Sequence, residues 1–519
     1  MRITFLGHAG FLVETDAAIL VADPWLSPSG AFDASWFQFP RNHQLAALVQ
    51  EKLADGSKAR YLYVSHEHKD HFDKAFLDSI QCRDFTVILP HFQRKALAEI
   101  MAGYQCQDLV LASDQAEVPI SGGTLKLYLD DSELNRDSAM LLKADGQSFL
   151  NLNDCRITDA LPVIRREEGA IDVLAMQFSG ANWHPVCYDY PADRYEAISR
   201  KKVRAKFHGV AQAVKTISPT FYLPSAGPPC FLDPGLLDIN FQPANIFPAA
   251  WSLTEFLDGR FPAAATAWPE LMPGDVLDVS AGTVLAEGTE RVDEAGYRGY
   301  VEAYAAEYAP FFRARQQRYG TWDPGDLLQR LAEDLRGKLA ALDLHDRILT
   351  NLYFGFTDAP GAMLRVNFPD RDVSVCRDVG ESSFYRIQAP SWEVARVLDD
   401  RISWEDFAHT FRMRLSREPD LYQTAISAFL RLDAEDLNRF CAKILSIESR
   451  QERIIKEAGG SRYAVDRYCP HQGGDLLYGW VDEDRFLTCP RHGWRFDLEK
   501  GGACPDSVGS VHAACLEED

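Results

Sequence analysis

The chain has 519 residues, of which 46% are hydrophobic and 11% aromatic, and its formal net charge is −22. This length predicts more than one domain, and the composition is typical of globular domains with packed cores. The negative charge argues against nucleic acid as a partner, because binding a phosphate backbone requires a basic surface.

Targeting features and cysteine usage lead us to expect a cytoplasmic protein without a membrane partner. No apolar run reaches the roughly 20 residues that a membrane-spanning helix needs. The first residues, MRITFLGHAGFLVET, lack a basic stretch followed by a long apolar one, so we expect a β-strand there and not a signal peptide. The 11 cysteines are scattered, which favours buried thiols and metal ligands over disulfides.

Residues 1–245 alternate short apolar runs with helical patterns. The expected strands are ITFLGHAGFLVET, AAILVADPW, YLYVSHEH, TVILP, LVLA, TLKLYLD, SAMLLKAD, SFLNLND, IDVLAMQF and PTFYLP. Segments such as DKAFLDSI and QRKALAEIMAG between them have helical patterns. This density of strands predicts two packed sheets with outer helices.

Three further regions follow the Pro- and Gly-rich segment PSAGPPCFLDPG. Residues 246–345 are expected to be mostly helical, since LLQRLAEDLRGKLAAL has leucines on one helical face. Residues 346–449 are expected to be an α+β region for docking or for assembly of a homodimer. Within it, MLRVNFPDRDVSVCR and SSFYRIQA are predicted strands, and WEDFAHTF and EDLNRFCAKIL are predicted helices. Residues 450–519 are expected to form short, glycine-rich strands.

Within the segment YLYVSHEHKDHFD, the six residues from position 66 to 71 hold three histidines and an aspartate, directly after a run of strand-forming residues. Imidazole and carboxylate groups are ligands for divalent metals. Because alternate residues at the end of a strand point the same way, His66 and His68 can converge on one ion. Asp70 and His71, in the turn that follows, can converge on a second position beside it. The spacing therefore predicts a metal site for one or two ions.

This H-x-H-x-D-H pattern resembles the metallo-β-lactamase superfamily, as do MRITFLGHAGF, Asp23 in ADPW and Asp154 in FLNLND. The resemblance covers about 245 residues and implies an αββα sandwich. It also implies that Asp154, at the end of a strand, lies between two metals. The catalytic and metal-binding residues expected from it are His66, His68, Asp70, His71 and Asp154.

The sequence departs from that superfamily's pattern at two ligand positions. The superfamily usually supplies one more histidine before the Asp154 segment and another near the end of the domain. Between residues 72 and 154 the only histidine is His91, for which a capping or surface role is favoured, and Asp131 in LYLDDSE is an alternative ligand. The second position has no histidine, so His184 in SGANWHPVCY is the predicted further ligand. His8 is expected to line the pocket, and a ligand role for it stays open.

CPHQGGDL and CPRHGWRFDLEKGGAC, near the carboxyl end, each combine a cysteine with a histidine. Such residues could hold structural zinc. However, the mixed C-x-H and C-x-x-H pairs suit a 2Fe-2S cluster in which two cysteines bind one iron and two histidines the other. The two segments resemble a Rieske domain of roughly 70 residues. The resemblance implies that the cluster ligands are Cys469, His471, Cys489 and His492.

The two sites together predict redox chemistry. A Rieske cluster transfers electrons, whereas zinc has no redox chemistry, so we expect one or two non-haem iron ions in the first site, with zinc as the alternative. Open positions on such an iron activate O2, which is therefore the expected co-substrate. The combination resembles the CMP-N-acetylneuraminate hydroxylase family, in which the Rieske domain comes first and not last. That resemblance implies hydroxylation of a small molecule, at carbon or nitrogen, with electrons from a reductase and a small carrier such as a ferredoxin or a cytochrome.

Two other functions stay open from the sequence. One is a metallo-hydrolase that the Rieske tail regulates as a redox switch, and the other is an electron carrier or sensor without catalysis. Substrate specificity is assigned to Trp183, Tyr188 and residues 224–232, with packing in a core as the alternative for the aromatic residues. A basic stretch could meet an anionic group or form a solvated helix face, and it comprises Lys201, Lys202 and Arg204.

Overall fold

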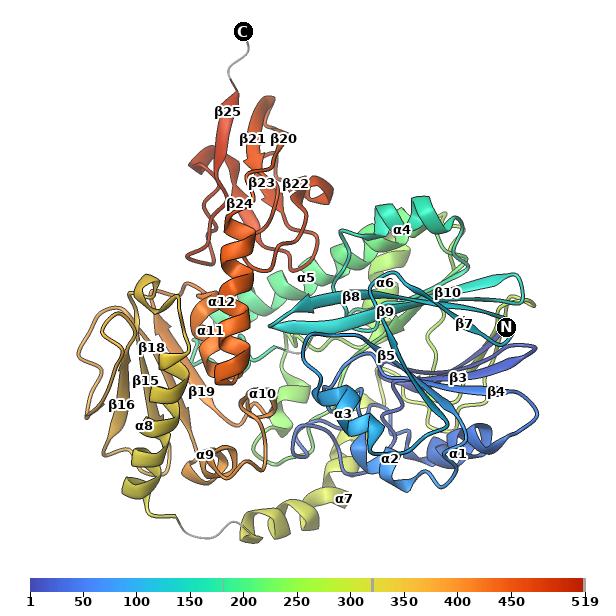
Figure 1. Cartoon of the computed structure of the whole chain (residues 1–519), viewed down its shortest axis with the longest axis horizontal. Helices are drawn as coiled ribbons and strands as arrows, with labels where there is room; N and C mark the ends of the chain where they lie inside the picture. The colour runs from blue at the N-terminus through green and yellow to red at the C-terminus, as the bar shows by residue number, and fades with distance from the viewer. Residues whose placement is uncertain (181, 319–321, 517–519) are drawn as a thin grey trace. The chain divides into compact units, whose positions relative to one another are not determined.

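The computed structural model describes residues 1–180, 182–318 and 322–516 (Figure 1). They form two compact units, of which the first comprises residues 1–131, 135–181 and 196–310. The second unit comprises residues 132–134, 182–195 and 311–519. Each unit is thus assembled from separate stretches of the chain. Within the described residues, no helix has both the length and the apolar character needed to cross a membrane.

The first unit contains an eight-stranded sheet in the order β14-β13-β1-β2-β3-β4-β5-β6. Its strands are Arg2–Gly7 (β1), Gly10–Glu14 (β2), Ala18–Ala22 (β3), Ala59–Tyr63 (β4), Thr86–Pro90 (β5), Asp108–Ala112 (β6), Val276–Asp278 (β13) and Thr283–Leu285 (β14). Strands β3 to β6 are parallel, so their carboxyl ends share one edge of the sheet. The histidine motif follows β4 and therefore lies at this edge.

A second, six-stranded sheet of the same unit has the order β12-β11-β10-β9-β8-β7. Its strands are Glu117–Ile120 (β7), Gly123–Ser132 (β8), Asn135–Ala144 (β9), Gln147–Asn151 (β10), Val173–Gln177 (β11) and Phe221–Ser225 (β12). Strands β10, β11 and β12 are parallel. Asp154 follows β10 by three residues and lies at the carboxyl edge of these strands.

Hydrophobic clusters hold the two sheets and their helices in four layers. Phe11 and Leu20 of the first sheet and Leu125, Met140 and Phe149 of the second belong to one buried core. Helices α1, α2 and α3 pack on the outer side of the first sheet, and α4, α5 and α6 on that of the second. These helices are Ala46–Ala54, Lys74–Ser79, Ala96–Ala102, Leu161–Glu168, Ala192–Ile217 and Ala250–Arg260. The expected αββα sandwich is confirmed.

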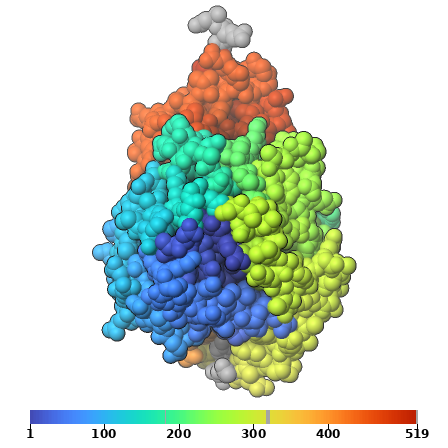
Figure 2. Space-filling model, turned by 90° about the vertical axis from the view of Figure 1, so that its right-hand side faces the viewer, coloured from blue at the N-terminus to red at the C-terminus, as the bar shows by residue number. Residues whose placement is uncertain are grey.

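The first unit continues past residue 245, where the sequence suggested a boundary. Strand β13 pairs with β1, with Arg2 opposite Asp278, and so extends the first sheet. At the surface, the dark-blue start of the chain borders the yellow-green segment that contains β13 (Figure 2). The 246–345 region, expected to be mostly helical, holds α6, α7 (Tyr297–Arg318) and α8 (Pro324–Ala340) together with two short strands.

The second unit contains a five-stranded sheet in the order β17-β16-β15-β18-β19. Its strands are Asn351–Phe356 (β15), Met363–Asn367 (β16), Asp372–Cys376 (β17), Phe384–Ala389 (β18) and Arg414–Glu418 (β19). The accompanying helices are Ser391–Leu398 (α9), Trp404–His409 (α10), Thr424–Arg431 (α11) and Ala434–Glu448 (α12). The leucine face of α8 is buried, as its spacing predicts. An α+β region with the predicted strands and helices is thus present.

The carboxyl end of the second unit has two small sheets, β20-β21-β25 and β22-β23-β24. Their strands are Arg453–Ala458, Ser461–Asp466, Ala513–Leu516, Trp480–Asp482, Phe486–Thr488 and Arg495–Asp497. A separate hydrophobic core includes Val465, Leu487 and Phe496 together with Cys469 and Cys489. The predicted small all-β region is present, and two predicted cluster ligands are part of its core.

Candidate functional site

The loop with the histidine motif is fixed at both of its ends. Asp23, which follows β3, accepts hydrogen bonds from the Ser65 backbone N–H at 2.8 Å and from the Ser65 hydroxyl at 2.6 Å. Asp73 accepts from the Phe76 N–H at 3.0 Å and thereby caps the start of α2. The residues between these anchors are held at the carboxyl edge of the first sheet.

One set of side chains forms what we call the first donor group, which consists of His66, His68 and Asp154. Each residue offers one nitrogen or oxygen atom, and these atoms lie within 4.8 Å of one another. His66 Nε2 lies 2.8 Å from His68 Nδ1 and 3.9 Å from Asp154 Oδ1. A single ion between them could contact all three residues.

The second donor group consists of His8, Asp70 and His71. His8 Nε2 lies 3.1 Å from Asp70 Oδ2, and His71 Nε2 lies 3.9 Å from the same oxygen. His71 Nε2 is also 3.6 Å from Asp154 Oδ1. Asp154 is therefore close to both groups, as expected for a carboxylate that lies between two metals.

Three buried atoms of these groups fit a bound metal. Asp70 Oδ1, His71 Nε2 and Asp154 Oδ1 have no hydrogen-bond partner among the residues that the structure describes. A buried polar atom without a partner costs roughly 1–3 kcal/mol. A divalent ion would satisfy these atoms, and imidazole and carboxylate donors suit iron or zinc.

The electrostatics of the second donor group also favour a cation. Burial alone would lower the pKa of His71, but Asp154, Asp70 and Asp23 outweigh it and raise this pKa well above its usual value. Burial alone would raise the pKa of Asp70, yet His71 and His8 hold it below its usual value. The carboxylates thus keep their negative charge and attract positive charge into the pocket, which a divalent ion supplies.

Carboxylates behind the donors orient the imidazole rings. Asp23, with no exposed surface, accepts a hydrogen bond from His71 Nδ1 at 2.8 Å. Asp137 Oδ1 lies 3.1 Å from His66 Nδ1. Because the Nδ1 atoms are engaged, the Nε2 atoms face the site, an arrangement common among metal-binding histidines. Asp137 was missed in the sequence, where its only signal is an acidic residue directly before the predicted strand SAMLLKAD.

His8 reaches the second donor group from the turn between β1 and β2. Its backbone has a φ of 53°, in the left-handed region, and the Ala226 N–H donates to its carbonyl at 2.9 Å. Ala226 itself has a φ of 50°. Such backbone conformations are enriched at functional sites. The residues 224–232, predicted to contribute to specificity, therefore adjoin the metal donors through Ala226.

His184 is not among the donors that the structure brings together. Its ring centroid lies 4.9 Å from that of Tyr188 and 5.7 Å from that of Tyr190, and its Nε2 is 3.1 Å from the Tyr190 hydroxyl. These aromatic contacts belong to the second unit. Within the described residues it is His8 that joins the second donor group, and the ligand role of His184 stays a prediction.

Other sequence candidates lie outside the two donor groups. Asp131 ends up on β8 and belongs to neither group. His91 is exposed, in keeping with a surface role. Along α5, Lys201 and Arg204 are exposed, whereas Lys202 is half-buried. A solvated helix face is therefore the better description of Lys201 and Arg204.

The two loops with the predicted cluster ligands share one hydrogen-bond pattern. Each cysteine N–H donates to the carbonyl five residues later, at 2.9 Å for Cys469 and 2.7 Å for Cys489. The N–H groups of Gly473 and Gly493 return to the cysteine carbonyls at 2.8 and 3.0 Å. Both glycines have a positive φ, 75° and 69°, which a residue with a side chain rarely adopts. Two matching tight loops thus present the four ligands.

The ligand side chains are close together at the ends of these loops. The rings of His471 and His492 have centroids 4.6 Å apart, and His471 stacks on Trp494 at 4.5 Å. A Cβ on Gly474 would lie 2.9 Å from Cys489 Sγ, so only glycine fits beside this sulfur. Burial, reinforced by Cys489, raises the pKa of Cys469 well above its usual value. Two buried thiols and two imidazoles fit a 2Fe-2S cluster, whose irons would stabilise the thiolates.

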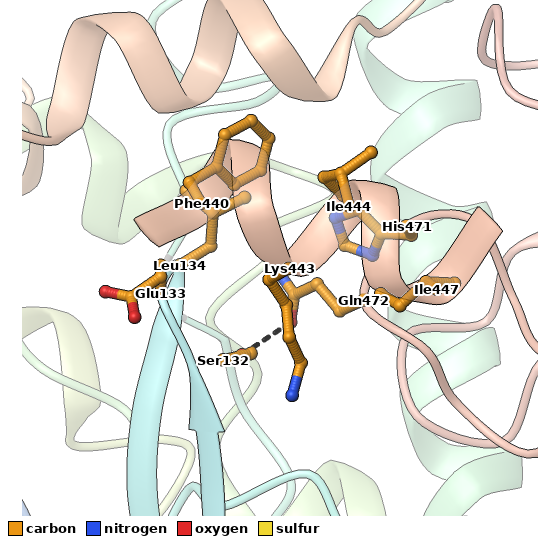
Figure 3. A pocket seen from close by; sticks show the side chains of 9 residues that line it. All are labelled: Ser132, Glu133, Leu134, Phe440, Lys443, Ile444, Ile447, His471 and Gln472. Atoms are coloured by element: carbon orange, nitrogen blue, oxygen red, sulfur yellow. Dashed lines mark hydrogen bonds between the residues drawn. The ribbon is translucent and has the colours of Figure 1, made fainter. Parts of the chain in front are cut away.

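A shallow pocket lies beside His471 (Figure 3). It is lined by Ser132, Glu133, Leu134, Phe440, Lys443, Ile444, Ile447, His471 and Gln472. The Ser132 hydroxyl donates to Gln472 Oε1 at 3.2 Å, as the dashed line in Figure 3 shows. All of these residues belong to the second unit, including those at the tip of the β8–β9 hairpin. The hairpin tip therefore contacts the loop that follows Cys469.

Comparison with known proteins places the chain in a family. Residues 433–512 match the model of the Rieske [2Fe-2S] domain, which defines the class as Rieske iron–sulfur protein. A protein of Mycolicibacterium smegmatis named for its Rieske 2Fe-2S character is 31% identical, and the match covers 96% of this chain and 97% of that protein. The chain belongs to the family of Rieske 2Fe-2S iron–sulfur proteins that this relative represents.

More distant relatives include cytidine monophosphate-N-acetylneuraminic acid hydroxylases. The hydroxylase of Asterias rubens is 21% identical over 81% of this chain and 64% of its own length. That of Mus musculus is 23% identical over 81% of this chain and 72% of its own length. The resemblance seen in the motifs is thus confirmed as distant homology to hydroxylases, and it extends well beyond the Rieske domain.

Solved structures with some similarity include CmlA, a diiron β-hydroxylase from Streptomyces venezuelae. It is 17% identical, covers 55% of this chain and 53% of its own, and has a TM-score of 0.36. The metallo-β-lactamase fold protein YhfI from Bacillus subtilis is 13% identical, covers 53% of this chain and 97% of its own, and has a TM-score of 0.33. Both TM-scores are low, so the αββα assignment rests on the strand orders described above and not on these structures.

Proposed function

We propose that the protein is a non-haem iron-dependent oxygenase that hydroxylates a small metabolite, with electrons delivered through its own Rieske cluster. One observation carries this proposal. Each donor group combines two imidazoles with one carboxylate: His66, His68 and Asp154 in the first, and His8, His71 and Asp70 in the second. Two histidines and one carboxylate are the ligand set of non-haem iron oxygenases.

The other residues of the site support the same reading. Iron bound by these donors would supply O2-dependent oxidation chemistry, for which zinc is not suited. Asp23 and Asp137 hold the imidazole rings in position, so that the donors are pre-arranged. Cys469, His471, Cys489 and His492 would bind the cluster that passes electrons on, and a reductase with a small redox carrier would supply them. The hydroxylase names of the distant relatives agree with this reaction type.

Metal content and oxygen uptake test the proposal together. We expect full-length protein purified without oxygen to contain more than two irons per chain, because the cluster accounts for two. His66→Ala should lose iron but keep the cluster absorbance, whereas Cys489→Ser should lose the cluster and keep the remaining iron. With NADH, a reductase and candidate metabolites, O2 uptake should require both sites. Two irons plus zinc, with turnover in the absence of O2, would instead establish a redox-regulated hydrolase.

A further inference from the structure

A half-buried lysine lies at the same sheet edge as Asp154. Lys206, on α5, donates to the Ser179 carbonyl at 2.7 Å and lies 3.4 Å from Gln177 Oε1. Arg156 donates to the same Gln177 oxygen at 3.3 Å. None of the ion pairs within the described residues provides Lys206 with a carboxylate. Two half-buried cations thus share one neutral acceptor.

The surroundings disfavour the charge of this lysine. Burial lowers the pKa of Lys206 well below its usual value, Arg156 and Lys202 lower it further, and Asp154 opposes them. A Cβ on Gly180 would lie 2.5 Å from Lys206 Cε and Nζ, so the backbone leaves space that the lysine occupies. An ammonium placed at such a cost, with no carboxylate in hydrogen-bonding contact, is unusual unless an anion is to be bound.

Backbone connections place Lys206 next to the metal donors. Gln177 ends β11 and pairs with Ser225, which ends β12. The Gln177 N–H donates to the carbonyl of Asn153, the residue before Asp154, at 3.0 Å. The residue after Ser225 donates to the carbonyl of the metal donor His8, as described above. In open α/β sheets, ligands bind outside the carboxyl ends of parallel strands.

Two buried hydroxyls at this edge have unused hydrogen-bonding capacity. Ser179 Oγ and Ser225 Oγ are buried and have no hydrogen-bond partner in the part of the chain that the structure describes. A Cβ on Gly227 would lie 2.2 Å from Ser179 Cβ, so the segments that carry the two serines are in direct contact. The two serines thus lie on adjoining segments, one of which carries the carbonyl that Lys206 contacts.

We propose that Lys206, Ser179 and Ser225 form a subsite for an oxyanion of the substrate, a carboxylate or a phosphate. The anion accepts hydrogen bonds from the ammonium and the two hydroxyls, and Arg156 adds positive charge. It thereby anchors the substrate beside Asp154. The substrate class of the proposed oxygenase would then be small molecules with a carboxylate or phosphate group, an inference that rests on the proposed function.

Equilibrium binding to the full-length, metal-containing protein tests the subsite. Calorimetric titrations use succinate, inorganic phosphate and, as neutral control, succinamide. We expect one of the anions to bind, succinamide not to bind, and Lys206→Met to weaken the anion at least about tenfold, as loss of a charged hydrogen bond predicts. Whichever anion shows this loss identifies the group, carboxylate or phosphate. The matched control Lys215→Met, at an exposed position on the same helix, should bind like the wild type.

A second variant keeps the proposal testable if Lys206→Met does not fold. Ser225→Ala leaves all charges in place and should weaken the same anion about threefold. Unchanged affinity in both Lys206→Met and Ser225→Ala, or no anion binding to the wild type, would overturn the subsite. An anion that binds only to the metals would give this unchanged affinity. The titration needs no turnover, so a chain that holds zinc and consumes no O2 would refute the oxygenase and leave the subsite standing.

Discussion

Single residues decide what the amino-terminal site can bind. The H-x-H-x-D-H motif and Asp154 could be assigned from the sequence because their spacing along the chain is itself the signal. The choice between His8 and His184 could not be made in this way. It depends on a turn between two strands meeting the end of a third, and neither histidine has a sequence pattern that reports this contact.

Replacing His8 tests its role as a donor. We expect His8→Asn to lower the metal content of the first unit, because the second donor group loses one of its two imidazoles. Asparagine tolerates the left-handed backbone of this position, so the fold should be kept. Metal per chain is measured by mass spectrometry and compared with the cluster absorbance. His184→Asn is the matched control, and loss of metal in that variant alone would contradict the assignment.

Asp23 offers a test of ring orientation. Asp23→Asn keeps the shape of the side chain but removes the charge that holds His71 Nδ1. Loss of such an outer partner typically reduces metal affinity by about 10–100-fold. Competition with a chelator measures this affinity. Asp16→Asn, at an exposed site, serves as control, and equal metal affinity in the two variants would rule out an orienting role.

Secondary-structure elements were predictable where their patterns are long. The apolar strands β3, β4, β9 and β11 and the leucine face of α8 have clear periodicity, and the structure contains them. Strands β13 and β14 have only three residues each, too few for a periodicity, and β13 extends the sheet by pairing with β1. The extent of the first unit was therefore beyond the reach of a local pattern.

Helix α8 also carries a buried charge with a consequence for stability. Lys338 is 3% exposed, and its ammonium lies 4.6 Å from the ring centroid of Trp404. Burial lowers its pKa to about 7, although Asp334 and Asp433 oppose the shift. Between that pH and about 10.5, the unfolded chain binds more protons than the folded one, so the free energy of unfolding should rise with pH.

Denaturant unfolding at several pH values measures this dependence. The contribution of Lys338 is at most about 1.4 kcal/mol per pH unit. Lys338→Met should flatten the rise and stabilise the second unit most at the acidic end of the window. The exposed Lys500→Met is the control and should retain the wild-type slope. An identical slope in Lys338→Met and wild type would show that the ammonium is not responsible.

The molecule as a whole joins two sites of different chemistry in one chain. The candidate ligands of both sites could be predicted from the sequence, since His471, His492 and their cysteines lie in two short motifs. What the sequence could not supply is how the chain is divided between units. Residues 132–134 and 182–195 belong to the second unit although the first unit surrounds them in the sequence.

Electron counting tests whether both sites are redox-active. A Rieske cluster takes up one electron, so reductive titration without oxygen should require about one equivalent per chain for the cluster alone. We expect the full-length protein to require more than one, and His66→Ala to require fewer than the wild type. Absorbance and electron paramagnetic resonance follow the titration. One equivalent for a metal-loaded wild type would mean that the amino-terminal metal does not change its oxidation state.

Because each unit is built from separate stretches of the chain, the two units cannot be produced as simple amino-terminal and carboxyl-terminal fragments. A fragment that starts at residue 311 would lack Tyr188 and Tyr190, which stack on each other at 5.4 Å, and the hairpin tip beside His471. A gene that encodes only this fragment would therefore produce an incomplete second unit. Apolar side chains that the missing segments cover would be exposed to solvent. Exchange of the second unit between related proteins would succeed only if residues 132–134 and 182–195 were exchanged together with it.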